Sequence, residues 1–238
     1  VCYYENYAQW RCLADYGGHE DASPGCVKYW NVDATLCDII VWSFADVCTP
    51  GIHAHRKIEN TDPKEYVFPM DNANTTRPRR DDVTSNYCDG REHQLYFTEF
   101  NDVSEIAYLP KARKFWRDQN PNVKITVAIG GWSFGGGARI APTLSNATSR
   151  AKLVESVKEM VTAYELDGVD WDIEYPGSTH STIAELRKDD DGRKVCPDNV
   201  NEAKNAPYDV TCHGMTRTQM VDDFNTLLKE TREKLDSI

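Results

Sequence analysis

Four short segments along the chain have the composition of strands: the first three are rich in β-branched and aromatic residues, and the fourth alternates apolar with acidic residues. The segments cover residues 2–7, 39–44, 123–129 and 168–174. Their length and composition predict short buried strands. The segments between them carry apolar residues at helical spacing, and strands that alternate with helices form parallel βα units. The chain is therefore predicted to be an α/β protein that holds about the first four units of a (β/α)8 barrel.

Helical spacing of apolar residues predicts three amphipathic helices. One lies within residues 104–118 and is interrupted or begins at Pro110, and a second can be capped by Ser149. A third covers residues 218–238. The predicted apolar faces are Leu153, Val154, Val157, Met160, Val161 and Tyr164 in the second helix, and Val221, Phe224, Leu227, Leu228, Leu235 and Ile238 in the third.

Three stretches are too long and polar for short barrel connections, and we interpret them as insertions into one domain that spans residues 1–238. They cover residues 8–30, 45–100 and 177–217. Each contains two of the eight cysteines, and a long loop without its own core gains stability from a disulfide. Zinc would be the competing explanation, but the chain has no Cys-x-x-Cys pair. The simplest pairing, among many that eight cysteines permit, is Cys12–Cys26, Cys48–Cys88 and Cys196–Cys212.

Charge and composition narrow the class of protein. The net charge is −11 and the pI is near 5.0, which argues against binding to nucleic acid, whose phosphates require a basic surface. No run of about eighteen apolar residues is present, so no membrane span is predicted. Because the chain opens on a strand-like segment, we expect Val1 to lie near a processed start. Paired cysteines and the glycosylation sequons at Asn74 and Asn146 predict a secreted protein.

The chemistry of the chain is concentrated in the fourth predicted strand. Asp170, Asp172 and Glu174 alternate there with Trp171 and Ile173, and the strand period of two puts the three acids on one face. Crowded carboxyls share protons and drive their pKa values apart, so a raised pKa at Glu174 would make it a general acid. A solvated acidic loop or a calcium loop is the alternative, but calcium loops lack bulky apolar residues at every second position.

The pattern Asp167-x-x-Asp170-x-Asp172-x-Glu174 resembles the signature of the family-18 glycoside hydrolases, the chitinases and their relatives. Two further segments agree in the expected order. Residues 1–7, VCYYENY, resemble the first barrel strand of animal-type chitinases, and residues 124–135, KITVAIGGWSFG, resemble the third strand and the turn that follows it. The resemblance covers most of residues 1–177.

The resemblance implies a role for each acid. Hydrolysis in the family is retaining and assisted by the substrate, whose acetamido oxygen attacks its own anomeric carbon. Glu174 would protonate the leaving oxygen, Asp172 would orient the acetamido group, and Asp170 would share a proton with Asp172. Asp167 lies out of register with these three and is expected to be a structural hydrogen-bonding residue. No metal or organic cofactor is implied.

The resemblance also places substrate-binding residues and one disulfide. Sugar rings stack on aromatic side chains, and Tyr3, Phe44, Trp132 and Tyr7 match positions that face the groove in similar chitinases, although core packing would also explain each aromatic residue. Gly131 is expected to let the backbone approach the substrate. In similar animal chitinases the positions of Cys2 and Cys37 are bridged.

The position of the acidic motif raises a question of completeness. Only 64 residues follow Glu174, whereas a barrel needs about 250 in all. We therefore expect the C-terminal half of the barrel to be supplied in the same or another chain. The leading functional hypothesis is a secreted chitinase that cleaves β-1,4 links in chitin. The alternatives are a carbohydrate-binding or extracellular-matrix protein on the same fold, and an endo-β-N-acetylglucosaminidase that acts on N-glycans.

Overall fold

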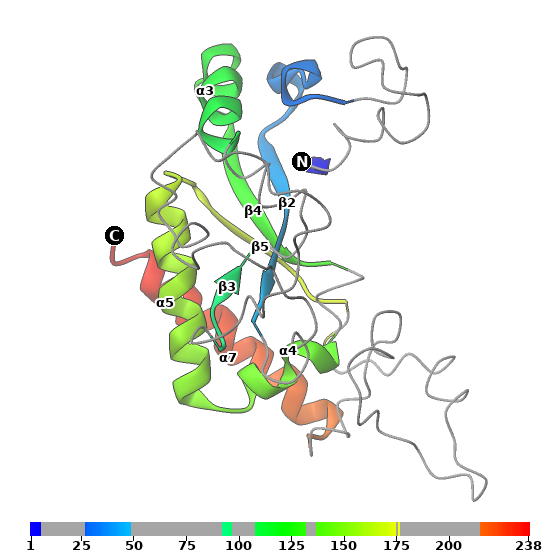
Figure 1. Ribbon diagram of the computed structural model, residues 1–238, viewed down its shortest axis with the longest axis vertical. Helices are drawn as coiled ribbons and strands as arrows, with labels where there is room; N and C mark the ends of the chain where they lie inside the picture. Colours follow the sequence, from blue (N-terminus) through cyan, green and yellow to red (C-terminus); the bar gives the residue numbers. More distant parts are fainter. Residues whose placement is uncertain (6–26, 49–91, 97–107, 132–136, 175, 177–214) are drawn as a thin grey trace, which may run out of the picture.

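A computed structural model of the 238-residue chain shows the arrangement of its strands and helices (Figure 1). The structure describes seven parts of the chain, and every structural statement below refers to them. They are residues 1–5, 27–48, 92–96, 108–131, 137–174, 176 and 215–238.

One sheet organises the described residues. Its parallel strands lie side by side in the order β1, β2, β4 and β5, which is also their order along the chain. The bounds are Cys2–Glu5, Ile39–Val47, Lys124–Gly130 and Gly168–Asp172. A two-residue strand, β3 (Leu95–Tyr96), pairs antiparallel with the end of β2. Four successive parallel strands confirm the predicted α/β class.

The helices cover the outer face of this sheet. Apolar side chains of the strands, including Ile40, Trp42, Ile125 and Val127, are fully or almost fully buried beneath them. Figure 1 shows α5 and α7 packed side by side near the strands. The helical elements are η2 (Tyr29–Asn31), η3 (Ala34–Leu36), α3 (Leu109–Gln119), α4 (Gly137–Leu144), α5 (Ala147–Ala163) and α7 (Arg217–Leu235).

Two predicted helix starts can be checked. Helix α3 begins at Leu109 with Pro110 in its first turn, where the missing N–H of proline has no cost, so the prediction of a start at Pro110 is confirmed. The predicted cap of the next helix, Ser149, is wrong. The α5 cap is Asn146, whose side-chain oxygen accepts hydrogen bonds from the backbone N–H groups of Thr148 and Ser149. An asparagine three residues earlier satisfies the free N–H groups of the first turn.

The buried face of α7 agrees with the predicted one in part, because Leu227 is buried and Phe224 and Leu235 pack against the core. Met220, Leu227 and Thr231 are its buried residues, whereas Val221 and Leu228 are 40% and 39% exposed. The third predicted position that fails, Ile238, lies beyond the helix end and is exposed. The observed stripe follows the helical period and shares Phe224, Leu227 and Leu235 with the predicted stripe, whereas Met220 and Thr231 stand in place of Val221, Leu228 and Ile238.

The expected insertions are shorter at their edges than the sequence predicts. Strand β2 runs through Ala45–Val47, and β3 lies near the end of the expected 45–100 insertion. Backbone hydrogen bonds from Cys48 N to Gln94 O and from His93 N to Cys48 O continue this short ladder. The ends of the segment are therefore held together beside the end of β2. The interiors of the three insertions lie outside the described residues.

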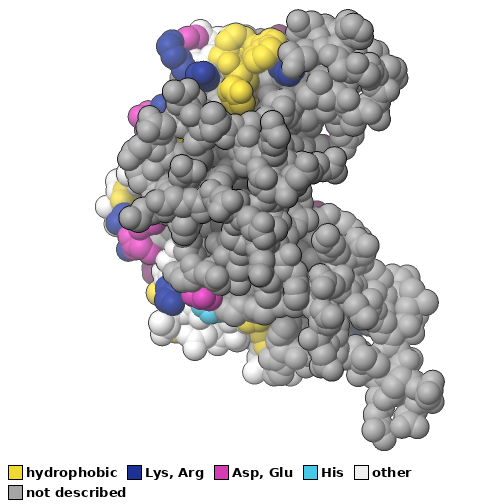
Figure 2. All heavy atoms as spheres, viewed as in Figure 1, with side chains coloured by type: hydrophobic (Ala, Val, Ile, Leu, Met, Phe, Trp, Pro, Cys, Tyr) yellow, Lys and Arg dark blue, Asp and Glu magenta, His cyan; other side chains and the backbone are white. Residues whose placement is uncertain are grey.

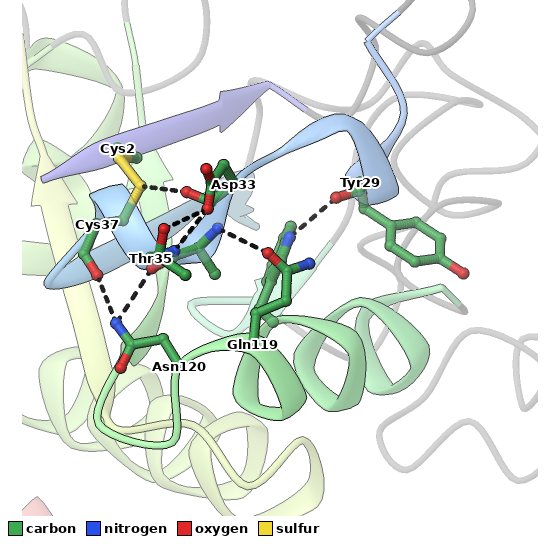
Figure 3. Close-up of a disulfide and its surroundings, with 9 residues drawn as sticks. Cys2, Tyr29, Asp33, Thr35, Cys37, Gln119 and Asn120 are labelled. Carbon is green, nitrogen blue, oxygen red and sulfur yellow. Dashed lines mark hydrogen bonds between the residues drawn. A yellow bond between two sulfur atoms is a disulfide. The ribbon is translucent and has the colours of Figure 1, made fainter.

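A disulfide joins Cys2 of β1 to Cys37, just before β2 (Figure 3). The Asn120 side chain donates hydrogen bonds to the backbone oxygens of Ala34 and Cys37 at 3.1 and 3.2 Å. The starts of β1 and β2 are thus fixed to the turn that follows α3. Cys48 also takes part in a disulfide, and no described cysteine is free. The predicted partner of Cys48 and both other predicted pairings involve cysteines outside the described residues.

Candidate active site

The strand register defines a polar face on the sheet. Neighbouring residues in a parallel ladder point to the same side. One row consists of Tyr3, Val41, Thr126 and Gly168, and the next of Glu5, Ser43, Ala128 and Asp170. The alternate residues, such as Tyr4, Trp42 and Val127, lie in the core under the helices. The two rows therefore face away from the helices, on the side that is the interior in a closed barrel.

The acidic motif projects from β5 toward this interior face. Asp170 and Asp172 belong to the strand, which ends at Asp172, and Glu174 follows it. Ile173 is buried and Trp171 is partly buried against the core. The alternation of acidic and apolar residues thus separates the carboxyls from the core, and the strand is present where the alternation predicts it. All three acidic residues are partly exposed.

Asp172 is the acid whose titration the site changes most clearly. Partial burial raises the pKa of Asp172 to about 6, and the neighbouring carboxyls of Glu174 and Asp170 add to this rise. A hydrogen bond with Glu174 raises it further, because protonated Asp172 can donate to that carboxylate. The alternation predicts a raised pKa at the end of the motif, and the structure places one at its middle residue, which has a carboxyl on either side.

Tyr3 reaches Asp170 across the interior face. The Tyr3 hydroxyl donates to Oδ2 of Asp170 at 2.8 Å, although β2 and β4 separate their strands. This bond and the nearby carboxylates raise the pKa of the Tyr3 hydroxyl. The bond fixes Asp170 from the opposite edge of the sheet. Tyr3, predicted as an aromatic surface for sugar, therefore also positions an acid.

Asp167 has the contacts of a structural residue. Its carboxylate accepts hydrogen bonds from Ile125 N at 2.8 Å, from Arg117 at 2.8 Å and from Lys124 at 3.2 Å. Burial raises the pKa of Asp167, but these three bonds outweigh burial and the pKa falls below its ordinary value. Asp167 ties the start of β5 to β4 and α3, at the end of the sheet opposite to Asp172.

Phe44 and Gly131 contact each other at the end of the strands. A Cβ atom on Gly131 would lie 3.0 Å from the Phe44 ring, and the φ angle of Gly131 is +85°, so both space and backbone require glycine. Gly131 N donates to Asp172 O at 2.7 Å, which joins the end of β4 to the acidic strand. Gly131 thus supports Phe44 and Asp172, a role that its predicted contact with substrate does not include. The Ser43–Phe44 peptide bond is cis.

Some predicted site residues cannot be placed. Trp132 and Tyr7 lie outside the described residues, as does the sequon at Asn74. One residue of the interior face was missed in the sequence: Glu5, which shares a row with Asp170. Its position two residues after Tyr3 on the same strand is the signal that could have identified it. Within the described residues, no group of His, Cys, Asp and Glu side chains is arranged to hold a metal ion.

The site and the fold together define a class of protein. Two carboxyls in hydrogen-bond contact, with a third behind them, can donate a proton to an oxygen and recover it. A parallel α/β sheet that carries such a group beyond its strand ends is typical of a glycoside hydrolase built on a barrel. The family model "Glycosyl hydrolases family 18" matches residues 1–238. The chain therefore belongs to glycosyl hydrolases family 18.

Curated relatives agree with this family. The chain is 24% identical over 148 residues to Chitinase A1 of Niallia circulans, and the match covers 62% of the chain and 21% of the relative. It is 25% identical over 190 residues to Chitotriosidase-1 of Mus musculus, and the match covers 79% of the chain and 28% of the relative. The chain thus spans less than a third of the length of either protein.

Solved structures establish the fold. A Group IV chitinase of Ostrinia furnacalis superposes with a TM-score of 0.51 at 20% identity, covering 100% of this chain and 40% of that chain. A chitinase-like agglutinin of Robinia pseudoacacia superposes with a TM-score of 0.51 at 16% identity, and the match covers 99% of this chain and 40% of that chain. The described strands are therefore part of a (β/α)8 barrel, as predicted. Among the described helices, none is long and apolar enough to cross a membrane.

Proposed function

We propose that the chain is the N-terminal part of a secreted chitinase that cleaves β-1,4 links between N-acetylglucosamine units with retention of configuration. The observation that carries this proposal is the hydrogen-bond contact between Asp172 and Glu174, which puts two acids side by side at the end of β5, and burial with the nearby carboxyls raises the pKa of Asp172 to about 6. A protein that only binds sugar does not need a proton donor. The disulfide at Cys2 and Cys37 supports secretion.

In the proposed reaction, Asp172 passes the proton of its hydrogen bond to Glu174, and Glu174 gives it to the glycosidic oxygen as the bond from that oxygen to C1 breaks. The acetamido oxygen of the same sugar attacks C1 and forms a cyclic cation. Asp172, left as a carboxylate between Glu174 and Asp170, turns toward this group and balances its positive charge. A water molecule then attacks C1 and returns its proton to Glu174. The Tyr3 hydroxyl bond keeps Asp170 in place for this exchange.

Three substitutions test the roles on soluble chito-oligosaccharides. Glu174→Gln removes the acid and should reduce kcat by about 10²–10⁴-fold, the usual contribution of general acid catalysis. Asp172→Asn should reduce it less, because asparagine can orient the acetamido group but cannot balance its charge. Asp118→Asn, an exposed residue of α3 that pairs with Lys114, is the control and should leave kcat unchanged. Near-full activity in Glu174→Gln would show that the acid is wrongly assigned.

The same assay separates the alternatives. Binding of chito-oligosaccharides without turnover by the complete protein would favour the carbohydrate-binding hypothesis. Release of a glycan from an N-glycoprotein, with no cleavage of chito-oligosaccharides, would favour the endo-β-N-acetylglucosaminidase. Turnover of chito-oligosaccharides that depends on Glu174 supports the chitinase.

A further inference from the structure

Glu5 is an acid that the reaction does not use. Strand β1 alternates, and Tyr4 is buried against the rings of Trp42 and Trp116 at centroid distances of 5.1 and 5.7 Å. Glu5 must point to the other side, the side from which Tyr3 contacts Asp170. The register places Glu5 in one row with Ser43, Ala128 and Asp170. Glu5 therefore belongs to the interior face, opposite to the acidic strand.

The Glu5 carboxylate is available for a ligand. Its residue is exposed, and Glu5 forms no hydrogen bond or ion pair with any other residue that the structure describes. Asp167, at the other end of the strands, is instead held by Arg117 and Lys124. An acid that served the fold would have such partners. Glu5 is therefore exposed and unpaired among the described residues, as expected of a carboxylate that binds a ligand.

The charge around Glu5 indicates what it would meet. In the described strands, the acids that are exposed or partly exposed toward the catalytic end are Glu5, Asp170 and Asp172, while the one cation, Lys124, starts β4 and contacts Asp167. The whole chain also carries a net charge of −11. A neutral polysaccharide gains little from such a field, whereas a cationic one is attracted to it.

We propose that Glu5 is a specificity-determining residue that favours partially deacetylated chitin by binding the ammonium group of a glucosamine unit. This inference rests on the proposed function. The sugar that is cleaved must keep its acetamido group, because that group attacks C1. The glucosamine unit bound by Glu5 must therefore be a neighbour of the cleaved unit along the same polymer.

The test uses two oligosaccharides of equal length in the complete protein, one fully acetylated and one with glucosamine units beside an acetylated unit. In the wild type, kcat/KM at pH 6 should favour the partially deacetylated substrate. Glu5→Gln should reduce that preference by about 2–5-fold, the range of an exposed ion pair. The rate on the fully acetylated substrate should change less than twofold. High salt should shrink the wild-type preference, since it screens the pair.

Glu165→Gln is a matched control, because Glu165 is an exposed acid that contacts Arg113 away from the interior face; it should leave the preference unchanged. An unchanged preference in Glu5→Gln would overturn the inference. Equal losses on both substrates would overturn it as well, since the ammonium would then have no special contact. If the wild type cleaved neither substrate, the proposed chitinase function itself would fail. If the wild type cleaved both substrates and Glu5→Gln left the preference unchanged, only the inference about Glu5 would fail.

Discussion

At the residue scale, the site depends on how one strand divides its side chains between two environments. Trp171 and Ile173 pack toward the core, so Asp170 and Asp172 are forced to the other face. Partial burial, with the carboxyls of Glu174 and Asp170 close by, then raises the pKa of Asp172, in the middle, to about 6. The local sequence thus creates a carboxyl that keeps its proton to a higher pH than an ordinary aspartate does.

The raised pKa of Asp172 has a cost in stability. The folded state holds this proton more tightly than the unfolded state, so the benefit is present below pH 4 and is lost as pH rises to about 6. Asp172→Asn keeps a hydrogen-bond donor for Glu174 and never ionises. At pH 7 it should stabilise the protein by about 1 kcal/mol, a value reduced for solvent contact. Thermal unfolding should show a higher Tm for Asp172→Asn than for the wild type at pH 7 and no difference between them at pH 4. A Tm for the variant equal to that of the wild type at pH 7 would contradict the raised pKa.

Asn146 offers a second prediction at this scale, because it is both a helix cap and the acceptor of a sequon. Asn146→Ala should lower the free energy of unfolding by about 1 kcal/mol through loss of the cap. Thr148→Ala also destroys the sequon but keeps the cap, since the Thr148 backbone N–H makes the contact. Chemical denaturation of both variants checks this, and equal losses would show that the cap contributes nothing.

At the element scale, periodicity predicted where strands and helices lie but not how each helix sits. The strands follow from short apolar runs and, in β5, from the alternation of acidic and apolar residues, and α5 follows from the helical spacing of its apolar residues. The α7 stripe was misplaced in part, because Val221 and Leu228 are as apolar as Met220 and Leu227 and the packing of α7 on α5 and α4 selects between them. The Tyr3–Asp170 bond and the position of Glu5 require the strand register, which sequence periodicity does not supply. The Cys2–Cys37 bond was expected from resemblance alone.

The contact between α5 and α7 has an ionic centre that can be tested. Arg150 is nearly buried, and its guanidinium contacts Leu144 O at 2.5 Å, Glu230 at 3.2 Å and Asp223 at 3.8 Å. Arg150→Ala should cost about 2 kcal/mol, less than a fully buried pair because both acids keep solvent contact. Denaturant unfolding measures this loss.

A surface pair on α7 is the control for Arg150. Lys229 and Glu233 are both largely exposed, so Lys229→Ala should change stability by less than about 0.5 kcal/mol. A loss in Arg150→Ala as small as that in Lys229→Ala would mean that packing alone holds α7 on α5.

At the scale of the whole molecule, the described sheet has two outer strands, β1 and β5, and in the described part each pairs on one side. The interior face carries polar groups and Tyr3, which is 59% exposed. Open parallel edges favour pairing with further strands. Residues 1–238 expressed alone should therefore self-associate as concentration rises, which sedimentation would show. A monodisperse monomer that unfolds cooperatively would mean that the edges are closed in another way.

The most direct test of the proposed chemistry is the anomeric configuration of the first product. The complete protein would be given a soluble N-acetylglucosamine oligomer, and the new reducing end would be observed by proton NMR before it mutarotates. Participation of the acetamido group requires two inversions at C1, so the β-anomer should appear first and should disappear in Glu174→Gln. Initial formation of the α-anomer, or a β-product that persists without Glu174, would contradict the mechanism proposed for Asp170, Asp172 and Glu174.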